Sequence, residues 1–352
     1  MLWVDKYRPN SLEKLDYHEN ITKQLKALTQ LNDFPHIIFY GPPGAGKKTR
    51  INCVLKELFG SGVEKMKTIQ KEYQTPSGRK IDLNLVVSNY HIELNPGQVT
   101  TQDRVIIQNV IKEIAQTQQI DSTAQKRFKV VLLNEADHLS KDAQHALRRT
   151  MEKYSANLRL ILCCDNTSKI ISPIQSRCLL LRISAPEEKD IVNILNQVAS
   201  KEGIKLPQKF AYTIANKSNR NLRRALLMLE TARVQQYPFS EDQNVILPDW
   251  EVYIKNLTNM ILQEQSPERA LQVRGKLYEL ITHCIPPTLI IKTLAIELAQ
   301  NVDNQLKGRI FQEAAKYEAN LQKGNKAIFH IEAFVIKVMA IYKKYIIDMT
   351  KF

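Results

Sequence analysis

The feature that most constrains the fold of this 352-residue chain is a short apolar run that leads directly into a glycine-rich loop. Residues 34–40 read FPHIIFY, residues 41–50 read GPPGAGKKTR, and a helical pattern follows. A strand, such a loop and a helix together form a phosphate site, because glycines let backbone N–H groups converge on phosphate oxygens and the helix N-terminus attracts anions. We therefore predict a nucleotide site in which Lys47 holds the outer phosphates. A glycine-rich turn without a ligand is the alternative.

Three further apolar runs predict the sheet to which this loop belongs. They lie at residues 128–133, 158–164 and 178–183, and helical stretches separate them. Short apolar strands that alternate with helices are typical of an α/β fold with a parallel sheet and helices on both faces. We assign residues 1–184 to this core. One of its expected helices, residues 103–115, carries a single apolar stripe made by Ile107, Val110, Ile111 and Ile114.

The rest of the chain has a helical pattern throughout. Ser-Ala-Pro at 184–186 marks one boundary and residues 237–248 mark a second, which predicts a helical domain at 185–240 and an all-helical domain at 241–352. Residues 327–342 are apolar nearly all round, as in a helix buried among others. No apolar segment reaches the roughly 18 uninterrupted residues of a membrane helix, and the N-terminus lacks the pattern of a secretory signal.

The predicted nucleotide site lacks two groups that would hold magnesium. Such a site uses a hydroxyl directly after the loop lysine and an Asp at the end of a later strand, but this chain has Lys48 and Asn134 there. Thr49 cannot substitute, because one residue along a helix turns a side chain by roughly 100°, and Asp137 lies beyond the strand end. Lys48 supplies part of the missing positive charge, and Glu135 remains as a general base. We expect ATP or ADP to bind without tightly coordinated Mg²⁺, with slow or absent hydrolysis; an empty loop is the alternative.

Net charge and cysteine content restrict the partners and the compartment. The chain has 50 basic and 36 acidic residues, a net charge of +14, which favours a polyanionic partner such as nucleic acid. A basic protein without such a partner is the alternative. Its 5 cysteines include no C-x-x-C pair, so neither a disulfide framework nor a zinc site is expected. This cysteine usage fits a reducing compartment.

A series of motifs carries a resemblance to a known family. In chain order the motifs are WVDKYRP at 3–9, the glycine loop, NEAD at 134–137, AQHALRRTME at 143–152 and SRC at 176–178. This series resembles the small subunits of replication factor C, the eukaryotic clamp loader of the AAA+ class, and the likeness runs over essentially the whole chain. The paired lysines of the loop and the NEAD segment look most like the subunit at the end of the pentameric arc, whose own ATP site is degenerate.

This resemblance implies an architecture and a cellular role. The architecture would be an AAA+ core, a helical lid at 185–240 and a helical collar at 241–352 that joins subunits. The role would be to open a sliding clamp and load it onto primer–template DNA in replication and repair, in the nucleus, together with four other clamp-loader subunits. An autonomous AAA+ ATPase with unorthodox metal ligands and a scaffold without nucleotide are the alternatives.

The resemblance also places nucleotide contacts on matching residues. The N-terminal segment would line the adenine pocket, Arg223 would reach the phosphates from the lid, and Asp165 stands where the first sensor motif has a polar Asn. Arg220-Asn221 departs from the usual Gly-Asp before the lid arginine. The predicted nucleotide contacts are Val4, Tyr7, Arg8, Pro9, Asp16, Pro42, Pro43, Gly44, Ala45, Gly46, Lys47, Lys48, Thr49, Arg50, Asp165 and Arg223.

Arg177 has two interpretations. From its spacing alone it is an arginine that solvates the end of a strand. The resemblance implies instead an arginine finger that contacts the nucleotide of a neighbouring subunit, where a guanidinium neutralises charge on the transferring phosphate. A chain that has lost its metal ligands but kept this arginine would hydrolyse ATP poorly in its own site and would enable hydrolysis in the site of the neighbouring subunit.

Contacts with DNA and with the clamp follow from the resemblance as well. Arg104 and Lys141 each open a predicted helix and would contact DNA phosphates; an ordinary solvated charge is the alternative for both. Arg148 and Arg149 fit subunit coupling or salt bridging better than DNA binding. Ile114 and residues 115–120 would touch the clamp, unless they are buried against the core.

Overall fold

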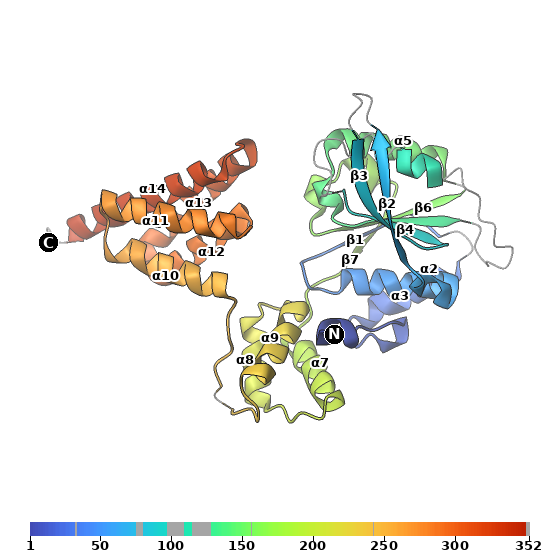
Figure 1. The fold of residues 1–352 in the computed structure, drawn as a ribbon, viewed down its shortest axis with the longest axis horizontal. Helices are drawn as coiled ribbons and strands as arrows, with labels where there is room; N and C mark the ends of the chain where they lie inside the picture. The colour runs from blue at the N-terminus through green and yellow to red at the C-terminus, as the bar shows by residue number, and fades with distance from the viewer. Residues whose placement is uncertain are drawn as a thin grey trace. The chain divides into compact units, whose positions relative to one another are not determined.

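The chain forms two compact units, Met1–Val245 and Ile246–Phe352, which are described separately (Figure 1). The computed structural model describes residues 1–31, 34–74, 80–96, 109–114, 128–155, 157–241 and 243–349. Figure 1 shows a sheet flanked by helices and a smaller group of helices, α7 to α9, in the first unit, and only helices in the second. The division of the first unit at residues 184 and 185 stays a prediction.

The sheet of the first unit has seven strands in the order β2-β3-β4-β5-β6-β1-β7. Strands β4, β5, β6, β1 and β7 pair in parallel, whereas β3 pairs antiparallel with both β2 and β4. The predicted parallel core is confirmed, but an antiparallel hairpin extends it. The strands are β1 Ile37–Tyr40, β2 Lys67–Gln74, β3 Lys80–Val87, β4 His91–Leu94, β5 Lys129–Leu133, β6 Leu158–Cys164 and β7 Leu179–Arg182.

The four strands predicted from apolar runs are β1, β5, β6 and β7, while β2, β3 and β4 were not predicted. The sequence of β2, KTIQKEYQ, is mostly polar, because this strand lies at the edge of the sheet and has little apolar surface to bury. Apolar runs therefore identify the central strands and miss the edge hairpin.

Helices cover both faces of the sheet, as predicted. Successive side chains of a strand point to opposite faces. In β1, Ile37 and Phe39 pack with residues of α2 and α3, whereas Ile38 packs with α5 and with the helical residues 109–114. Within the predicted stripe of 103–115, Val110, Ile111 and Ile114 are buried in this second layer, and Ile107 lies outside the described residues.

The helices of the first unit are the flanking layers and the α7–α9 group. Helix α1 contacts α9, which ties the N-terminal segment to that group. Their bounds are α1 Trp3–Lys6, η1 Leu12–Lys14, α2 Glu19–Gln30, α3 Lys47–Phe59, η2 Gly60–Glu64, η4 Ala136–His138, α5 Lys141–Lys153, η5 Thr167–Lys169, α6 Ser172–Gln175, α7 Glu188–Lys201, α8 Gln208–Lys217 and α9 Leu222–Gln235.

The second unit consists of helices around one apolar core. Phe334 of α14 is completely buried in it, but Phe329 and Ile336 of the same helix are 60% and 47% exposed. Residues 327–342 were predicted to be buried nearly all round, but within this chain only one face of the helix is buried. No helix in the described part of the chain is long and apolar enough to cross a membrane. The helices are α10 Asp249–Gln263, α11 Pro267–Thr282, α12 Pro287–Gln300, α13 Asn304–Lys323 and α14 Ala327–Met349.

Candidate functional site

The glycine loop follows β1 and ends where α3 begins at Lys47. Gly44 and Gly46 have φ angles of +75° and +80°, in the left-handed region that favours glycine. A Cβ at Gly44 would lie 1.9 Å from the Asn221 side-chain oxygen, and one at Gly46 would lie 2.3 Å from the Tyr17 hydroxyl. Both positions therefore need glycine for backbone conformation and for space. The N-terminus of α3 directs backbone N–H groups toward the loop, which suits an anion.

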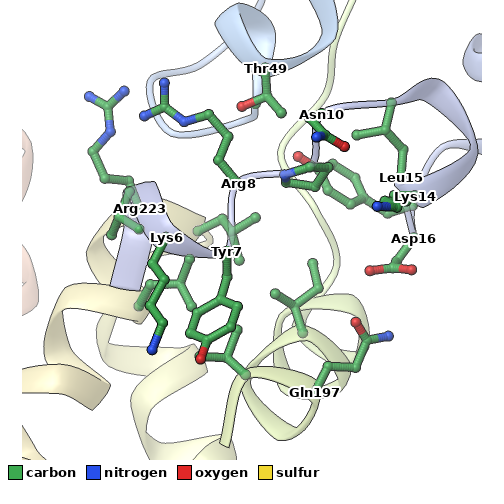
Figure 2. A pocket seen from close by; sticks show the side chains of 18 of the residues that line it. Lys6, Tyr7, Arg8, Asn10, Lys14, Leu15, Asp16, Thr49, Gln197 and Arg223 are labelled. Atoms are coloured by element: carbon green, nitrogen blue, oxygen red, sulfur yellow. The ribbon is translucent and has the colours of Figure 1, made fainter. Parts of the chain in front are cut away.

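A pocket of about 540 Å³ lies beside this loop (Figure 2). Its volume is within the usual range for a small-molecule site. The residues that line it come from four places: the N-terminal segment, the glycine loop with the start of α3, helix α7 and helix α9. The predicted contacts that line it are Val4, Tyr7, Arg8, Pro9, Asp16, Gly44, Gly46, Thr49 and Arg223.

Sequence reasoning missed several residues of this pocket. Gln197 and Lys201 lie one turn apart on α7, and a polar pair at that spacing beside apolar residues was the available signal. The remaining lining residues that were not predicted are Lys6, Asn10, Lys14, Leu15, Tyr17, Ile194, Val198, Leu222 and Leu226.

Seven predicted contacts do not line the pocket: Pro42, Pro43, Ala45, Lys47, Lys48, Arg50 and Asp165. Arg50 is fully buried, and its guanidinium donates to the backbone oxygens of Tyr17, at 2.9 Å, and Ala45, at 3.3 Å. It also packs over the Tyr17 ring. Arg50 therefore supports the loop from within the chain, through two backbone oxygens and the Tyr17 ring.

Lys47 is held inside the loop that it follows. Its ammonium donates to the backbone oxygens of Gly41, at 2.6 Å, and Pro42, at 3.1 Å, and to a carboxylate oxygen of Asp165, at 2.6 Å. The Lys47 side chain is 9% exposed, whereas that of Asp165 is 56% exposed. Asp165 thus neutralises the lysine that the motif assigns to the phosphates, and bound phosphates would compete with this carboxylate.

Lys48 points to a different acid. Its ammonium lies 2.9 Å from Glu93 Oε2, and the Asn134 side-chain amide donates to the same oxygen over 3.4 Å. His91 Nε2 lies 3.9 Å from the other Glu93 oxygen, and burial lowers the pKa of this histidine. The sequence signal for Glu93 is a carboxylate between the apolar residues Ile92 and Leu94 of β4.

The donor set at this position does not suit magnesium. Mg²⁺ prefers six oxygen ligands in an octahedron, whereas Lys48 and Asn134 direct an ammonium and an amide toward the one buried carboxylate. No group of three or more His, Cys, Asp or Glu side chains in the described ranges could hold a metal ion. Glu135, the predicted base, is exposed at the start of η4 with a φ of +51°.

The lid side of the pocket begins with Asn221, whose side chain caps α9 by accepting from the Arg224 N–H at 3.1 Å. Arg223 is the second residue of this helix and is exposed. In the view of Figure 2, the guanidinium groups of Arg8 and Arg223 point to the same end of the pocket as Thr49. Arg8 also pairs with Asp5 at 2.8 Å.

An ion-pair cluster involves two residues of the pocket lining, Lys6 and Tyr7. Glu202, at the end of α7, accepts from Lys6 at 2.6 Å, from the Tyr7 hydroxyl, and from Arg233 of α9 at 3.3 Å. The Lys6 and Tyr7 hydrogen bonds lower the pKa of Glu202 to about 2. The cluster joins the N-terminal segment to α7 and α9.

Arg177 lies outside this pocket, in the turn between α6 and β7. Its guanidinium donates to the Pro173 backbone oxygen at 2.8 Å and pairs with Glu152 of α5 at 2.6 Å. Arg148 contacts the same carboxylate at 3.4 Å, and these guanidinium groups lower the pKa of Glu152. The Arg177 side chain is 33% exposed. It is therefore accessible from outside the chain.

The remaining predicted contacts are peripheral or lie outside the described residues. Lys141 is exposed as the first residue of α5. Arg104 and residues 115–120 fall outside the described ranges. Ile114 is buried against the core, which was the alternative to a contact with the clamp.

Similarity to known proteins covers both units of the chain. Three domain families match: "DNA polymerase III, delta subunit" over residues 17–187, "RCF1/5-like, AAA+ ATPase lid domain" over 193–234 and "Replication factor C subunit 3, C-terminal domain" over 250–346. Among solved structures, RuvB from Thermotoga maritima, a Holliday junction branch migration motor, matches with a TM-score of 0.50 and 17% identity over 72% of this chain and 79% of that one. This likeness, together with the lid-domain match, shows an AAA+ fold.

Full-length relatives are much more similar. Replication factor C subunit 3 of Mus musculus is 57% identical over 99% of this chain and 98% of its own. Replication factor C subunit 5 of Schizosaccharomyces pombe is 46% identical over 97% of both chains. Identity at this level over nearly the whole length shows that the chain belongs to the family of replication factor C subunits 3 and 5.

Proposed function

We propose that this chain is a clamp-loader subunit that binds ATP or ADP, hydrolyses it poorly, and donates Arg177 to the ATP site of a neighbouring subunit. Family membership supports the assembly role, with four other subunits, a sliding clamp and primer–template DNA as partners in the nucleus. The observation that supports the division of labour is that Lys48 and Asn134 occupy the positions where magnesium ligands are expected, while Arg177 lies outside the pocket and remains partly exposed.

The pocket has the parts that an adenine nucleotide needs. The lining includes apolar side chains such as Val4, Ile194 and Leu226 together with the Tyr7 ring, which suit a base. The glycine loop, Arg8 and Arg223 supply backbone N–H groups and positive charge for phosphates. Hydrolysis also needs a group that neutralises charge as the phosphate transfers, and a held Mg²⁺ normally does this. Because Lys48 and Asn134 stand where the two magnesium-holding residues would be, we expect the chain's own ATP hydrolysis to be slow.

Arg177 would act across a subunit boundary. Its partner Glu152 is itself exposed and shared with Arg148, so release of the guanidinium leaves that carboxylate paired. A planar, permanently charged guanidinium placed at a neighbour's phosphates accounts for about 10³–10⁵ in rate in related phosphoryl transfers.

The test compares two variants in the reconstituted complex with DNA and clamp. We expect Arg177→Ala to lower ATP hydrolysis at the adjacent site at least about tenfold, and Lys47→Ala to leave hydrolysis at that site nearly unchanged. Arg177→Lys keeps the charge but not the planar fork and should recover little. Arg182→Ala, which removes an exposed arginine of β7, is the matched control. Equal losses from Arg177→Ala and Lys47→Ala would contradict the proposal.

The autonomous ATPase predicted as an alternative has its own test. The isolated chain should hydrolyse ATP slowly, and the double change Lys48→Thr with Asn134→Asp, which restores both magnesium ligands, should accelerate it. Rapid turnover by the unchanged isolated chain would favour the autonomous enzyme.

The predicted contact of Lys141 with a DNA phosphate has a separate test. Lys141→Ala should weaken DNA binding, and the loss of affinity should be larger at low salt than at high salt.

A further inference from the structure

The pair of Lys48 and Glu93 lies at the carboxyl edge of the parallel strands. Strand β1 runs directly into the glycine loop, β4 carries Glu93 one residue before its end, and Asn134 follows the last residue of the neighbouring strand β5. The carboxyl ends of parallel strands meet at one edge of a sheet, and ligands bind there. Lys48 is the second residue of α3, directly after the loop. The pair therefore lies beside the glycine loop, at the edge of the sheet where phosphates would bind, although Lys48 itself is not among the residues that line the pocket.

Glu93 needs a positively charged partner to remain ionised in its buried position. It is 6% exposed, and a buried carboxylate is strongly destabilising unless it is paired and hydrogen-bonded. The described side chains around it are Lys48, Asn134 and His91. Asn134 is neutral. His91 is 2% exposed, and burial lowers its pKa, so it is neutral at physiological pH. Lys48 therefore supplies the positive charge.

The geometry distinguishes this pair from an ordinary surface salt bridge. A surface pair joins two exposed side chains and contributes little. Here one partner is buried, and the pair joins α3 to β4 across 45 positions of sequence. The Lys48 side chain nevertheless remains 43% exposed. An ammonium has three donors, so the one on Glu93 leaves two for another ligand.

We infer that the Lys48 ammonium, positioned by Glu93 and Asn134, is a resident cation that takes the place of Mg²⁺ at the phosphates of bound ATP or ADP. This inference rests on the proposed nucleotide binding. Because the cation belongs to the chain, nucleotide affinity becomes independent of the divalent cation concentration. Nucleotide binding without a metal ion and slow ATP hydrolysis then have one cause. A fixed ammonium neutralises the charge of the bound phosphates, but it cannot coordinate the attacking and leaving oxygens as a metal does.

The experiment measures the dissociation constants of ATP and ADP by calorimetry on the full-length chain, stripped of nucleotide, once with Mg²⁺ and once with EDTA. For the unchanged chain we expect the two constants to agree within about twofold. Lys48→Met removes the resident cation and leaves Glu93 without its charged partner. Its affinity in EDTA should fall, and the ratio of the two constants should rise to about tenfold or more, because Mg²⁺ can then bind between Glu93 and the phosphates.

Three further variants keep the result interpretable. Lys48→Arg retains the positive charge and should keep the ratio near one. Lys56→Met removes another ion-paired lysine of α3, whose partner is Glu64 at 2.6 Å, and should leave the ratio unchanged. If Lys48→Met does not fold, its combination with Glu93→Gln removes the buried charge. This double variant should bind more weakly than the unchanged chain in both media.

The possible outcomes separate this inference from the proposed function. Binding by the unchanged chain that is lost in EDTA and restored by Mg²⁺ would overturn the resident cation alone. An unchanged ratio in Lys48→Met would overturn it as well. Absence of nucleotide binding in both media would overturn both the resident cation and the proposed nucleotide site, while the role of Arg177 would still be decided by hydrolysis in the assembled complex.

Discussion

Lys48 and Thr49 are neighbours on α3, yet they face different parts of the site. Lys48 contacts Glu93, whereas Thr49 lines the pocket. The rotation of roughly 100° per helical residue accounts for this divergence. A hydroxyl at position 49 therefore cannot perform the task of one at position 48, as the sequence predicts. The chemistry of the site depends on which of two adjacent residues carries which group.

Glu202 provides a prediction at the scale of one titrating group. Its pKa is lowered from 4.5 to about 2, first by the Lys6 hydrogen bond and then by that of Tyr7. A carboxyl whose pKa is lowered by folding stabilises the folded state at pH values above its pKa in the unfolded chain. This stabilisation is lost as the pH falls toward the pKa of the folded state. We expect the difference in Tm between the unchanged chain and Glu202→Gln to be constant above pH 4.5 and to shrink between pH 4.5 and 2.

The control for this prediction is Glu13→Gln. Glu13 also pairs with a lysine, Lys26 at 2.8 Å, but its side chain is 76% exposed, so solvent screens the pair. Its effect on Tm should be small at every pH. A Glu202→Gln effect that stayed the same from neutral pH down to pH 2 would show that the carboxylate charge does not join the N-terminal segment to α7 and α9.

At the scale of elements, the turn before α9 shows how a departure from the family pattern is accommodated. Arg220 has a φ angle of +61°, in a region that costs most non-glycine residues about 1–2 kcal/mol. The preceding Asn219 has a φ angle of +53°, which asparagine tolerates better. Arg220 donates through its guanidinium to the backbone oxygens of Pro186 and Ala185, both at 3.0 Å. These bonds tie the start of α9 to the segment before α7 and offset the cost of the conformation.

This turn predicts an unusual order of stability. Arg220→Ala loses the two bonds and keeps the unfavourable φ, whereas Arg220→Gly loses the bonds but relieves the backbone. We expect Arg220→Gly to be more stable than Arg220→Ala by about 1 kcal/mol, as measured by urea unfolding of the first unit. At Asn193, an exposed position inside α7, the order should reverse, with alanine the more stable by about 1 kcal/mol. The same order at both positions would contradict the argument.

At the scale of the whole molecule, each unit contains one of the chain's 2 tryptophans. Trp3 is 6% exposed in the first unit, and Trp250 packs against the core of the second. Fluorescence of each tryptophan, with the other changed to phenylalanine, therefore reports the unfolding of one unit. This arrangement allows the stability of the helical C-terminal unit to be measured in the full chain.

The core of the second unit gives a prediction of magnitude. Phe334→Ala removes a completely buried ring and should lower the free energy of unfolding of this unit by about 3–5 kcal/mol. The signal is Trp250 fluorescence in a Trp3→Phe background during urea unfolding. Phe329→Ala, on the same helix but 60% exposed, should change the free energy by less than about 0.5 kcal/mol. A comparable loss in both would show that the two rings are equally buried in solution.

The sequence by itself determined the features that depend on local pattern. Apolar runs located the central strands, the glycines and Lys47 located the loop, and the missing hydroxyl and Asp were visible as Lys48 and Asn134. Each of these signals lies in consecutive residues or in a short motif, so that periodicity and residue chemistry suffice to read it.

Only the tertiary structure decided which distant side chains meet. The order of the strands brings Lys48 to Glu93 and Lys47 to Asp165, and the packing of α3 against the segment before α2 brings Arg50 to the Tyr17 backbone. No local pattern encodes these contacts, because they depend on which strands are neighbours and which side chains burial leaves in need of a partner. The polar edge strand β2 escaped prediction for a related reason: its conformation is fixed by hydrogen bonds to β3 and not by apolar burial of its own.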